Sequence, residues 1–238
     1  MTQLPQSLHE LQAVFDRWTR AIQKIQNHNE RIAFTRAEMP TLLLNRRLIK
    51  KILTDIVRGR RYPDVRQATL FLNEFILYIN NQRLFSARLY IYDAGQYTPI
   101  HDHNSWGVYG CVSGKIEVIR YHREDDETRL GYARLRETER IILLPADTSV
   151  VRPLNDGIHQ AGNPTSGTCV MFCVYGTPIR RLYVNQYDQT RNSVSRRYPP
   201  RLRKKQLAAQ ALDSMGGGLR VAGGHKRIYN PKDGNPSW

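Results

Sequence analysis

Apolar residues recur near the start of the chain at the spacing of a helix. Six of them follow one another at intervals of three and four, which places them on one face. They are Leu8, Leu11, Phe15, Trp18, Ile22 and Ile25. Ser7 and Glu10 stand where a capping box would begin this helix. A second helix is expected over the apolar positions 44–56, ending near Gly59, and Pro63 with Asp64 predicts a third one through about residue 72.

From about residue 73 the apolar pattern changes to that of strands. Short runs rich in Val, Ile, Tyr and Thr alternate with turn residues such as Ser113-Gly114 and Asn163-Pro164. The runs cover 85–93, 106–112, 115–122, 131–137, 140–145, 147–153 and 168–176. Many short strands at about ten-residue spacing predict a mainly β sandwich or barrel. We expect a helical section, 1–72, packed on a barrel, 73–188.

The last part of the chain, 189–238, differs from the rest in its charge. It holds eleven Lys or Arg against two Asp, so nine of the fifteen excess positive charges of the chain lie there. We expect a basic, partly extended C-terminal tail with one short helix over 204–214. Because the remaining residues carry only a modest excess, the charge argues against nucleic acid as the main partner.

Composition fits a globular protein of one domain with appendages. Of the 238 residues, 40% are hydrophobic and 24% charged, which excludes wholesale disorder. No apolar run approaches the ~18 residues that cross a bilayer, and the first residues lack the pattern of a secretory signal. The three cysteines, Cys111, Cys169 and Cys173, are odd in number and lack zinc-type spacing. We therefore expect no membrane partner, a reducing compartment and a cytoplasmic location.

Three of the seven histidines stand next to turns that precede strands. His101 and His103 follow a turn at Gly95, and residues i and i+2 of a strand point to the same face. His159 follows a second turn at 155–157. Imidazole suits iron, zinc, copper or nickel, so these three side chains are candidate ligands of one ion. The alternative is that they are polar residues on the rim of a barrel.

The spacing around these histidines resembles the two motifs of the cupins. The first motif is matched by Gly95, His101, His103 and Gly114, and the second by Gly157, His159 and Asn163. The resemblance implies a double-stranded β-helix barrel, or jelly roll, which agrees with the strand pattern. The first motif usually carries a glutamate ligand four residues after its second histidine, and this position is Gly107 here. The resemblance therefore implies a site of three histidines.

Within the cupins, residues 98–117 and 157–176 resemble the thiol dioxygenases, meaning cysteine dioxygenase and 3-mercaptopropionate dioxygenase. The resemblance covers about residues 60–190. It implies that His101, His103 and His159 hold Fe(2+), and that a small thiol and O2 are converted to a sulfinic acid without an external reductant. Three neutral ligands leave the charge of the ion uncompensated and three octahedral positions open, which suits a thiolate and dioxygen.

Other site residues follow from the same resemblance. The family carries a Ser-x-His-x-Tyr run on the strand after the third ligand, and here the three positions are Met171, Cys173 and Tyr175. We take Tyr175 as the catalytic candidate, and Cys173 as a residue of the substrate pocket. Trp106 matches a tryptophan of the bacterial branch and is expected near the substrate.

The residue that would bind a substrate carboxylate is argued from alternation. In the run 85–93, Arg88, Tyr90 and Tyr92 share one face, which suits a polar pocket. Arg88 could then hold a carboxylate through two hydrogen bonds. Arg180 and Arg181 are alternatives for this role, and Arg88 could instead make a structural ion pair.

Two other functions remain open from the sequence. One is a cupin enzyme that uses another metal and a non-thiol substrate. The other is a non-catalytic cupin that binds a ligand or RNA, with the basic tail as its binding arm. A monomer or a small homo-oligomer is expected in each case.

Overall fold

The computed structural model describes residues 5–60, 70–71 and 73–199. Three helices come first: α1 (Leu8–Ile22), α2 (His28–Leu43) and α3 (Arg46–Val57). Eleven strands follow within the described residues. They are β1 (Glu74–Ile79), β2 (Phe85–Tyr92), β3 (Ile100–His103), β4 (Gly107–Ser113), β5 (Ile116–Arg123), β6 (Leu135–Leu143), β7 (Thr148–Val151), β8 (Leu154–Gly162), β9 (Cys169–Gly176), β10 (Val184–Asp188) and β11 (Ser193–Arg197).

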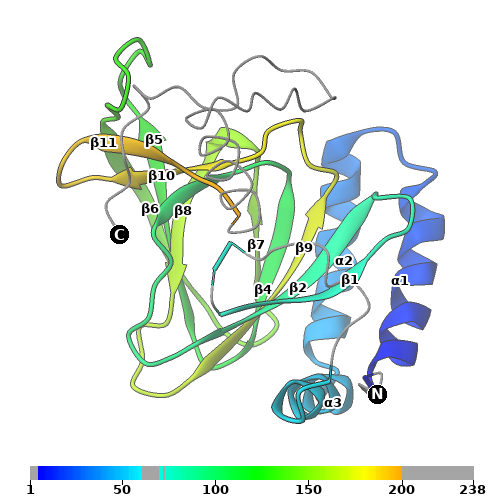
Figure 1. Ribbon diagram of the computed structural model, residues 1–238. Coiled ribbons are helices and arrows are strands. Elements are labelled where there is room, and N and C mark those ends of the chain that lie inside the picture. Colours follow the sequence, from blue (N-terminus) through cyan, green and yellow to red (C-terminus); the bar gives the residue numbers. More distant parts are fainter. Residues whose placement is uncertain (1–4, 61–69, 72, 200–238) are drawn as a thin grey trace, which may run out of the picture.

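The strands form two antiparallel sheets that face each other as a jelly-roll barrel (Figure 1). One sheet has the order β1-β2-β9-β4-β7, and the other has the order β11-β10-β3-β8-β5-β6. This arrangement confirms the predicted mainly β barrel with helices at its start. Ser193–Arg197, which we expected in the C-terminal tail, form β11 and pair with β10.

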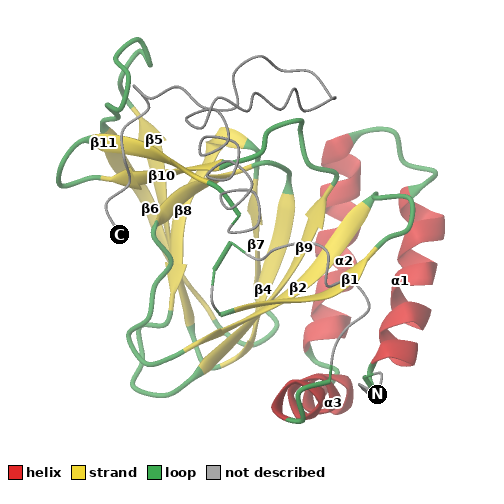
Figure 2. Cartoon of the chain, in the orientation of Figure 1, coloured by secondary structure: helices red, strands yellow, loops and turns green. Residues whose placement is uncertain are grey.

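All three helices lie on one side of the five-stranded sheet (Figure 2). Their apolar faces share one core with the outer face of that sheet. The alternation of β2 decides which side chains face which layer, because Ala87 and Leu89 belong to this helix-side core. Tyr90 and Tyr92 point the other way, into a second cluster between the sheets. The predicted two-faced character of this strand is therefore confirmed.

The helix predictions meet one correction and one addition. The predicted helices at 8–25 and 44–56 are confirmed as α1 and α3, and α2 lies between them without having been assigned separately. The side chain of Ser7 makes no cap bond with α1, so the predicted capping box is wrong. Instead, the Ser7 hydroxyl donates to the buried Asp55 carboxylate of α3, 2.7 Å away, and the same carboxylate accepts the Ser7 N–H. The helix expected after Pro63 lies outside the described residues, as does the one over 204–214.

Two strand predictions are also corrected. The end of the run 131–137 and the start of the run 140–145 lie in one strand, β6. The register of β6 against β5 shifts between Arg120 and Tyr121. This bulge interrupts the alternation, so the sequence suggested two strands. The turn expected at 155–157 lies inside β8, because the chain turns at Leu154, whose φ is +60°. Gly157 allows this turn, since a Cβ there would lie 1.8 Å from the Arg152 carbonyl oxygen.

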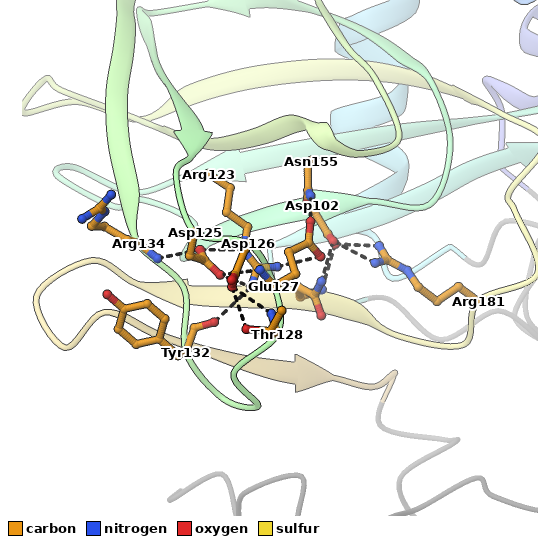
Figure 3. Close-up of polar contacts among 11 residues, drawn as sticks. Asp102, Arg123, Asp125, Asp126, Glu127, Thr128, Tyr132, Arg134, Asn155 and Arg181 are labelled. Carbon is orange, nitrogen blue, oxygen red and sulfur yellow. Dashed lines mark hydrogen bonds and ion pairs between the residues drawn. The ribbon is translucent and has the colours of Figure 1, made fainter.

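The loop between β5 and β6 is ordered by one carboxylate (Figure 3). Asp125 accepts two hydrogen bonds from the Arg123 guanidinium, at 2.8 and 2.9 Å, and one from the Arg134 backbone N–H. The Arg123 side chain also donates to the Tyr132 carbonyl. These bonds lower the pKa of Asp125 to about 2, the bond from Arg123 being the main cause. The loop therefore has an ionic centre of its own.

Candidate metal centre

The three candidate ligand histidines meet between the two sheets. His101 and His103 lie on β3, and His159 lies on β8, where it is the register partner of His101. Their ring centroids are 4.8 to 5.0 Å apart, and one nitrogen from each lies within 4.8 Å of the others. All three side chains are buried. The prediction that residues far apart in the sequence converge here is confirmed.

Hydrogen bonding and burial prepare the imidazoles to act as ligands. The Nδ1 atom of His101 lies 2.8 Å from the Pro99 carbonyl oxygen. A carbonyl only accepts, so Nδ1 carries the hydrogen and Nε2 keeps its lone pair. Burial lowers the pKa of His101, and it holds the pKa values of His103 and His159 well below the ordinary value. The rings are therefore neutral at pH 7, as metal binding requires.

The spacing of the nitrogens suits a single ion. Nitrogen ligands bind at about 2.0–2.1 Å, so two neighbouring ones on one ion lie about 2.8–3.4 Å apart for octahedral to tetrahedral angles. The Nε2 atoms of His103 and His159 are 3.3 Å apart. Two neutral imidazole nitrogens this close share no more than one hydrogen between them, and an ion between them would satisfy both lone pairs. The residues present therefore fit a bound metal, with His101 as the third donor.

The position of the family glutamate is taken up by an aromatic ring. A Cβ on Gly107 would lie 2.7 Å from Cδ1 of Tyr175. Tyr175 stacks on His103, with ring centroids 5.6 Å apart and planes at 22°. Burial, with a side-chain hydrogen bond to Tyr90, raises the pKa of Tyr175 well above 10. The catalytic candidate thus lies beside a candidate ligand and keeps its proton at neutral pH.

Arg88 also lies over the ring of Tyr175, with its guanidinium carbon 5.4 Å from the ring centroid. Its Nη1 atom forms an ion pair with Glu74 of β1, whose side chain is fully buried. Burial alone would lower the pKa of Arg88, but the Glu74 carboxylate outweighs it and the guanidinium stays charged. The Nε–H of Arg88 is buried and has no partner among the described residues. Arg88 therefore makes a structural ion pair and still has a free donor.

The other predicted pocket residues divide between the two faces of the sheet. Tyr90, Tyr92 and Cys173 are buried in the cluster between the sheets. Trp106, expected near the substrate, lies instead in the helix-side core, where its indole packs over Gly176. Cys173 is the register partner of Arg88 and of Tyr109, but it is not part of the metal-binding group found among the described residues. Burial raises the pKa of its thiol, which stays protonated.

Arg181, an alternative carboxylate anchor, is already bound to Asp102 (Figure 3). Its guanidinium donates to both oxygens of Asp102, at 2.6 and 2.8 Å, and to the Asn104 side chain. Asp102 also accepts from the backbone and side chain of Asn185. Asp102 faces away from the candidate ligands on either side of it, as its place between them predicts. Arg180 is exposed, so neither of these arginines offers a free guanidinium to the site.

Four residues near the site were not identified from the sequence. Glu74 is the counterion of Arg88, and Tyr109 lies edge-on to His159 with centroids 5.5 Å apart. Phe71 lies against His101, with centroids 5.1 Å apart, and Arg197 lies over Phe71. Tyr109 alternates with Val108 in its strand, so its inward direction could have been predicted. The contacts of the other three depend on the tertiary fold.

A cleft of about 350 Å³ reaches the site from the side of β5, β7 and β8. Its lining includes Arg120, His122, Asn155 and His159. His159 is the one predicted site residue that lines this cleft, whereas Arg88 and Tyr175 do not line it. The cleft therefore brings solvent to the His159 side of the cluster.

Comparison with known proteins gives distant structural matches. A cupin 2 domain-containing protein from Halorhodospira halophila matches with a TM-score of 0.37 and 17% identity, over 56% of this chain and 79% of that one. A cupin 2 conserved barrel domain protein from Salinispora arenicola has a TM-score of 0.34 and 18% identity, over 49% and 86%. A DMSP lyase from Ruegeria pomeroyi has a TM-score of 0.38 and 14% identity, over 60% and 73%. No protein-family model matches the chain. The jelly-roll assignment itself rests on the strand order of the two sheets.

Among the helices of the described part of the chain, none has the length and apolar character needed to span a membrane.

Proposed function

We propose that this chain is a mononuclear non-haem iron thiol dioxygenase that oxidises a small thiol to its sulfinic acid with O2. The observation that carries the proposal is the buried group of three neutral imidazoles, with Tyr175 stacked on one of them and Arg88 beside Tyr175. A ferrous ion bound by His101, His103 and His159 would bring the thiolate and dioxygen together, and the sulfur would supply the four electrons that reduce O2. One O2 is consumed for each thiol, and both oxygen atoms end on sulfur.

The residues around the histidines supply charge balance and orientation. Three neutral rings add no negative charge to the site, and Gly107 adds none either. Arg88, with its free Nε–H, is placed to accept an anionic end of the substrate, because Nε is one arm of the fork with which arginine grips a carboxylate. Glu74 holds the opposite arm, so the guanidinium does not need to move when substrate binds.

Tyr175 acts in this proposal as a hydrogen-bond donor. Its pKa lies well above 10, so it cannot serve as a base at neutral pH, but its hydroxyl can donate to an oxygen atom close to His103. The family partners of this tyrosine are replaced by Met171 and Cys173. The Tyr175 hydroxyl is hydrogen-bonded to Tyr90 in their place, as the donor, because this bond raises the pKa of Tyr175.

Anaerobic reconstitution with Fe(II) tests the proposal. Oxygen uptake and sulfinate formation are measured with cysteine, 3-mercaptopropionate, cysteamine and mercaptosuccinate. We expect one O2 consumed per sulfinate formed, with no added reductant. The His159→Ala variant should lose iron and turnover, while His28→Ala, which alters an exposed histidine of α2 outside the cleft, should keep both.

Two results would contradict the proposal. A protein that binds one iron per chain but consumes no oxygen with any of the four thiols is not a dioxygenase of these substrates. A protein that selects another metal from a mixture, and turns over only with that metal, would instead support the cupin enzyme with a non-thiol substrate.

A further inference from the structure

Five side chains form a closed ring of contacts beside the candidate metal ligands. His101 contacts Phe71, with ring centroids 5.1 Å apart, and Phe71 contacts Tyr90 at 6.5 Å. Tyr90 shares a side-chain hydrogen bond with Tyr175, which stacks on His103 at 5.6 Å. His103 and His101 close the ring at 4.8 Å. A ligand on this side of the histidines is therefore bounded by these groups.

Phe71 is the member of this ring that does not come from a barrel strand. It precedes β1, and its ring is 8% exposed. The other four side chains come from β2, β3 and β9, whose backbones are held by ladder hydrogen bonds on both sides. The position of this part of the ring of contacts therefore depends on how Phe71 is held.

Side chains of the barrel hold Phe71 in place. The Glu74 carboxylate accepts the backbone N–H groups of Leu70 and Phe71, at 2.8 and 3.3 Å. The Arg197 guanidinium of β11 donates to the Leu70 carbonyl at 3.1 Å and lies 5.1 Å from the Phe71 ring centroid. Arg197 is itself bound to Gln186 of β10, which is the register partner of His101. The segment is thus tied to the strand that carries two of the ligands.

We infer that Phe71 is a specificity-determining residue of the proposed thiol site, and that Arg197 is the positioning residue that holds it against His101. A ligand bound on the Phe71 side of the histidines would meet the edge of this ring, and a substituent on the carbon next to the sulfur would crowd against it. The ligand class is small thiols with an unsubstituted carbon at the sulfur. This inference rests on the proposed function, because it defines the substrates of that same site.

The test measures ligand binding to the Co(II)-loaded protein under anaerobic conditions, so that no turnover is needed. Thiolate binding is followed by the thiolate-to-metal absorption band. The ligands are 3-mercaptopropionate and 3-mercaptobutyrate, which differ by one methyl group at the carbon that bears sulfur. One such group is worth about 10–200-fold in a closed apolar pocket, and we expect wild type to favour the unbranched ligand by this order.

Removing the ring should remove the discrimination. In Phe71→Ala the ratio of the two dissociation constants should fall at least about tenfold, and in Arg197→Gln it should fall in the same direction. The matched control is Phe75→Ala, which removes the same ring from the helix-side core and should leave the ratio unchanged. If Phe71→Ala does not fold, Phe71→Leu makes the same comparison. An unchanged ratio in the folded Phe71 variant overturns the inference.

A second pair of probes separates this inference from the proposed function. If wild type binds Co(II) but neither thiol, the proposed function fails, and the variants are then compared with azide and imidazole as a small and a large ligand. A tenfold gain in affinity for imidazole relative to azide in Phe71→Ala would support the role of Phe71 as the wall, and no change would overturn it. If wild type binds no Co(II), both proposals fall.

Discussion

Glu74→Gln tests whether the buried ion pair beside the site is an integral part of the fold. Glutamine keeps one side-chain oxygen that can accept the N–H groups of Leu70 and Phe71, and its NH2 group then faces Arg88, so the substitution removes both the charge and the acceptor of the ion pair. The Glu74 side chain is fully buried, and that of Arg88 is 19% exposed. Removing one partner of a buried pair costs about 3–5 kcal/mol, because the other charge stays buried without a counterion. We expect about 3 kcal/mol, at the low end, since Arg88 keeps some contact with water.

The assay is equilibrium unfolding of the metal-free protein in urea, which excludes any contribution from metal binding. A change in the midpoint with an unchanged slope identifies a change in stability. The matched control is Glu137→Gln, which breaks the exposed pair with Arg140 and should cost less than about 1 kcal/mol. The double variant Glu74→Gln with Arg88→Met should recover about 2 kcal/mol relative to the sum of the single losses, because no unpaired charge remains. A loss below about 1 kcal/mol in Glu74→Gln, or simple additivity in the double variant, would refute the reasoning.

Three further predictions concern the site and its surroundings. Arg88→Lys keeps a cation for Glu74 but removes the Nε–H, so KM for 3-mercaptopropionate should rise about 10–100-fold and KM for cysteamine should change little; equal increases would exclude Arg88 as the carboxylate anchor. Gly107→Ala should lower the free energy of unfolding by about 1–3 kcal/mol, because the new Cβ overlaps the ring of Tyr175. In the double variant with Tyr175→Ala, which removes that ring, the loss should be smaller than the sum of the two single losses. Losses that simply add in urea unfolding would contradict this. The pKa of Asp125 is lowered to about 2, so its ion pair with Arg123 stabilises the fold above pH 4 and is lost as pH falls toward 2. Wild type should therefore exceed Asp125→Asn by about 2 kcal/mol at pH 6, and this difference should shrink in unfolding curves taken at decreasing pH; a constant difference would show that the charge is not responsible.

The metal-binding group was predictable because its signals are local. His101 and His103 are two residues apart in a strand, which places them on one face, and the spacing that resembles the two cupin motifs adds His159. The alternation of β2 likewise predicted that Arg88 and Tyr90 face the interior. Alternation with a period of two predicts on which face of the sheet a side chain lies, without knowledge of the neighbouring strands.

Glu74, the counterion of Arg88, could not be identified from local patterns, and neither could Phe71 and Arg197 beside His101. Glu74 begins a strand whose other residues are mostly apolar. Its burial can be explained only once its ion pair with Arg88 is known. Phe71 and Arg197 are 126 positions apart and meet because β11 returns beside β10, the neighbour of β3. Trp106 was expected near the substrate because a resemblance between sequences gives only a position in the chain, whereas the side of the sheet depends on the local register.

The contact between Gly107 and Tyr175 makes these two positions interdependent. A glutamate at 107 and an aromatic ring at 175 would require the same volume, so this barrel can carry an acidic fourth ligand or the tyrosine, but not both. Any redesign of the centre toward an anionic ligand set must therefore exchange both residues together. A library that varies position 107 alone would contain mainly variants with steric overlap. Their failure could be attributed wrongly to the charge of the new side chain.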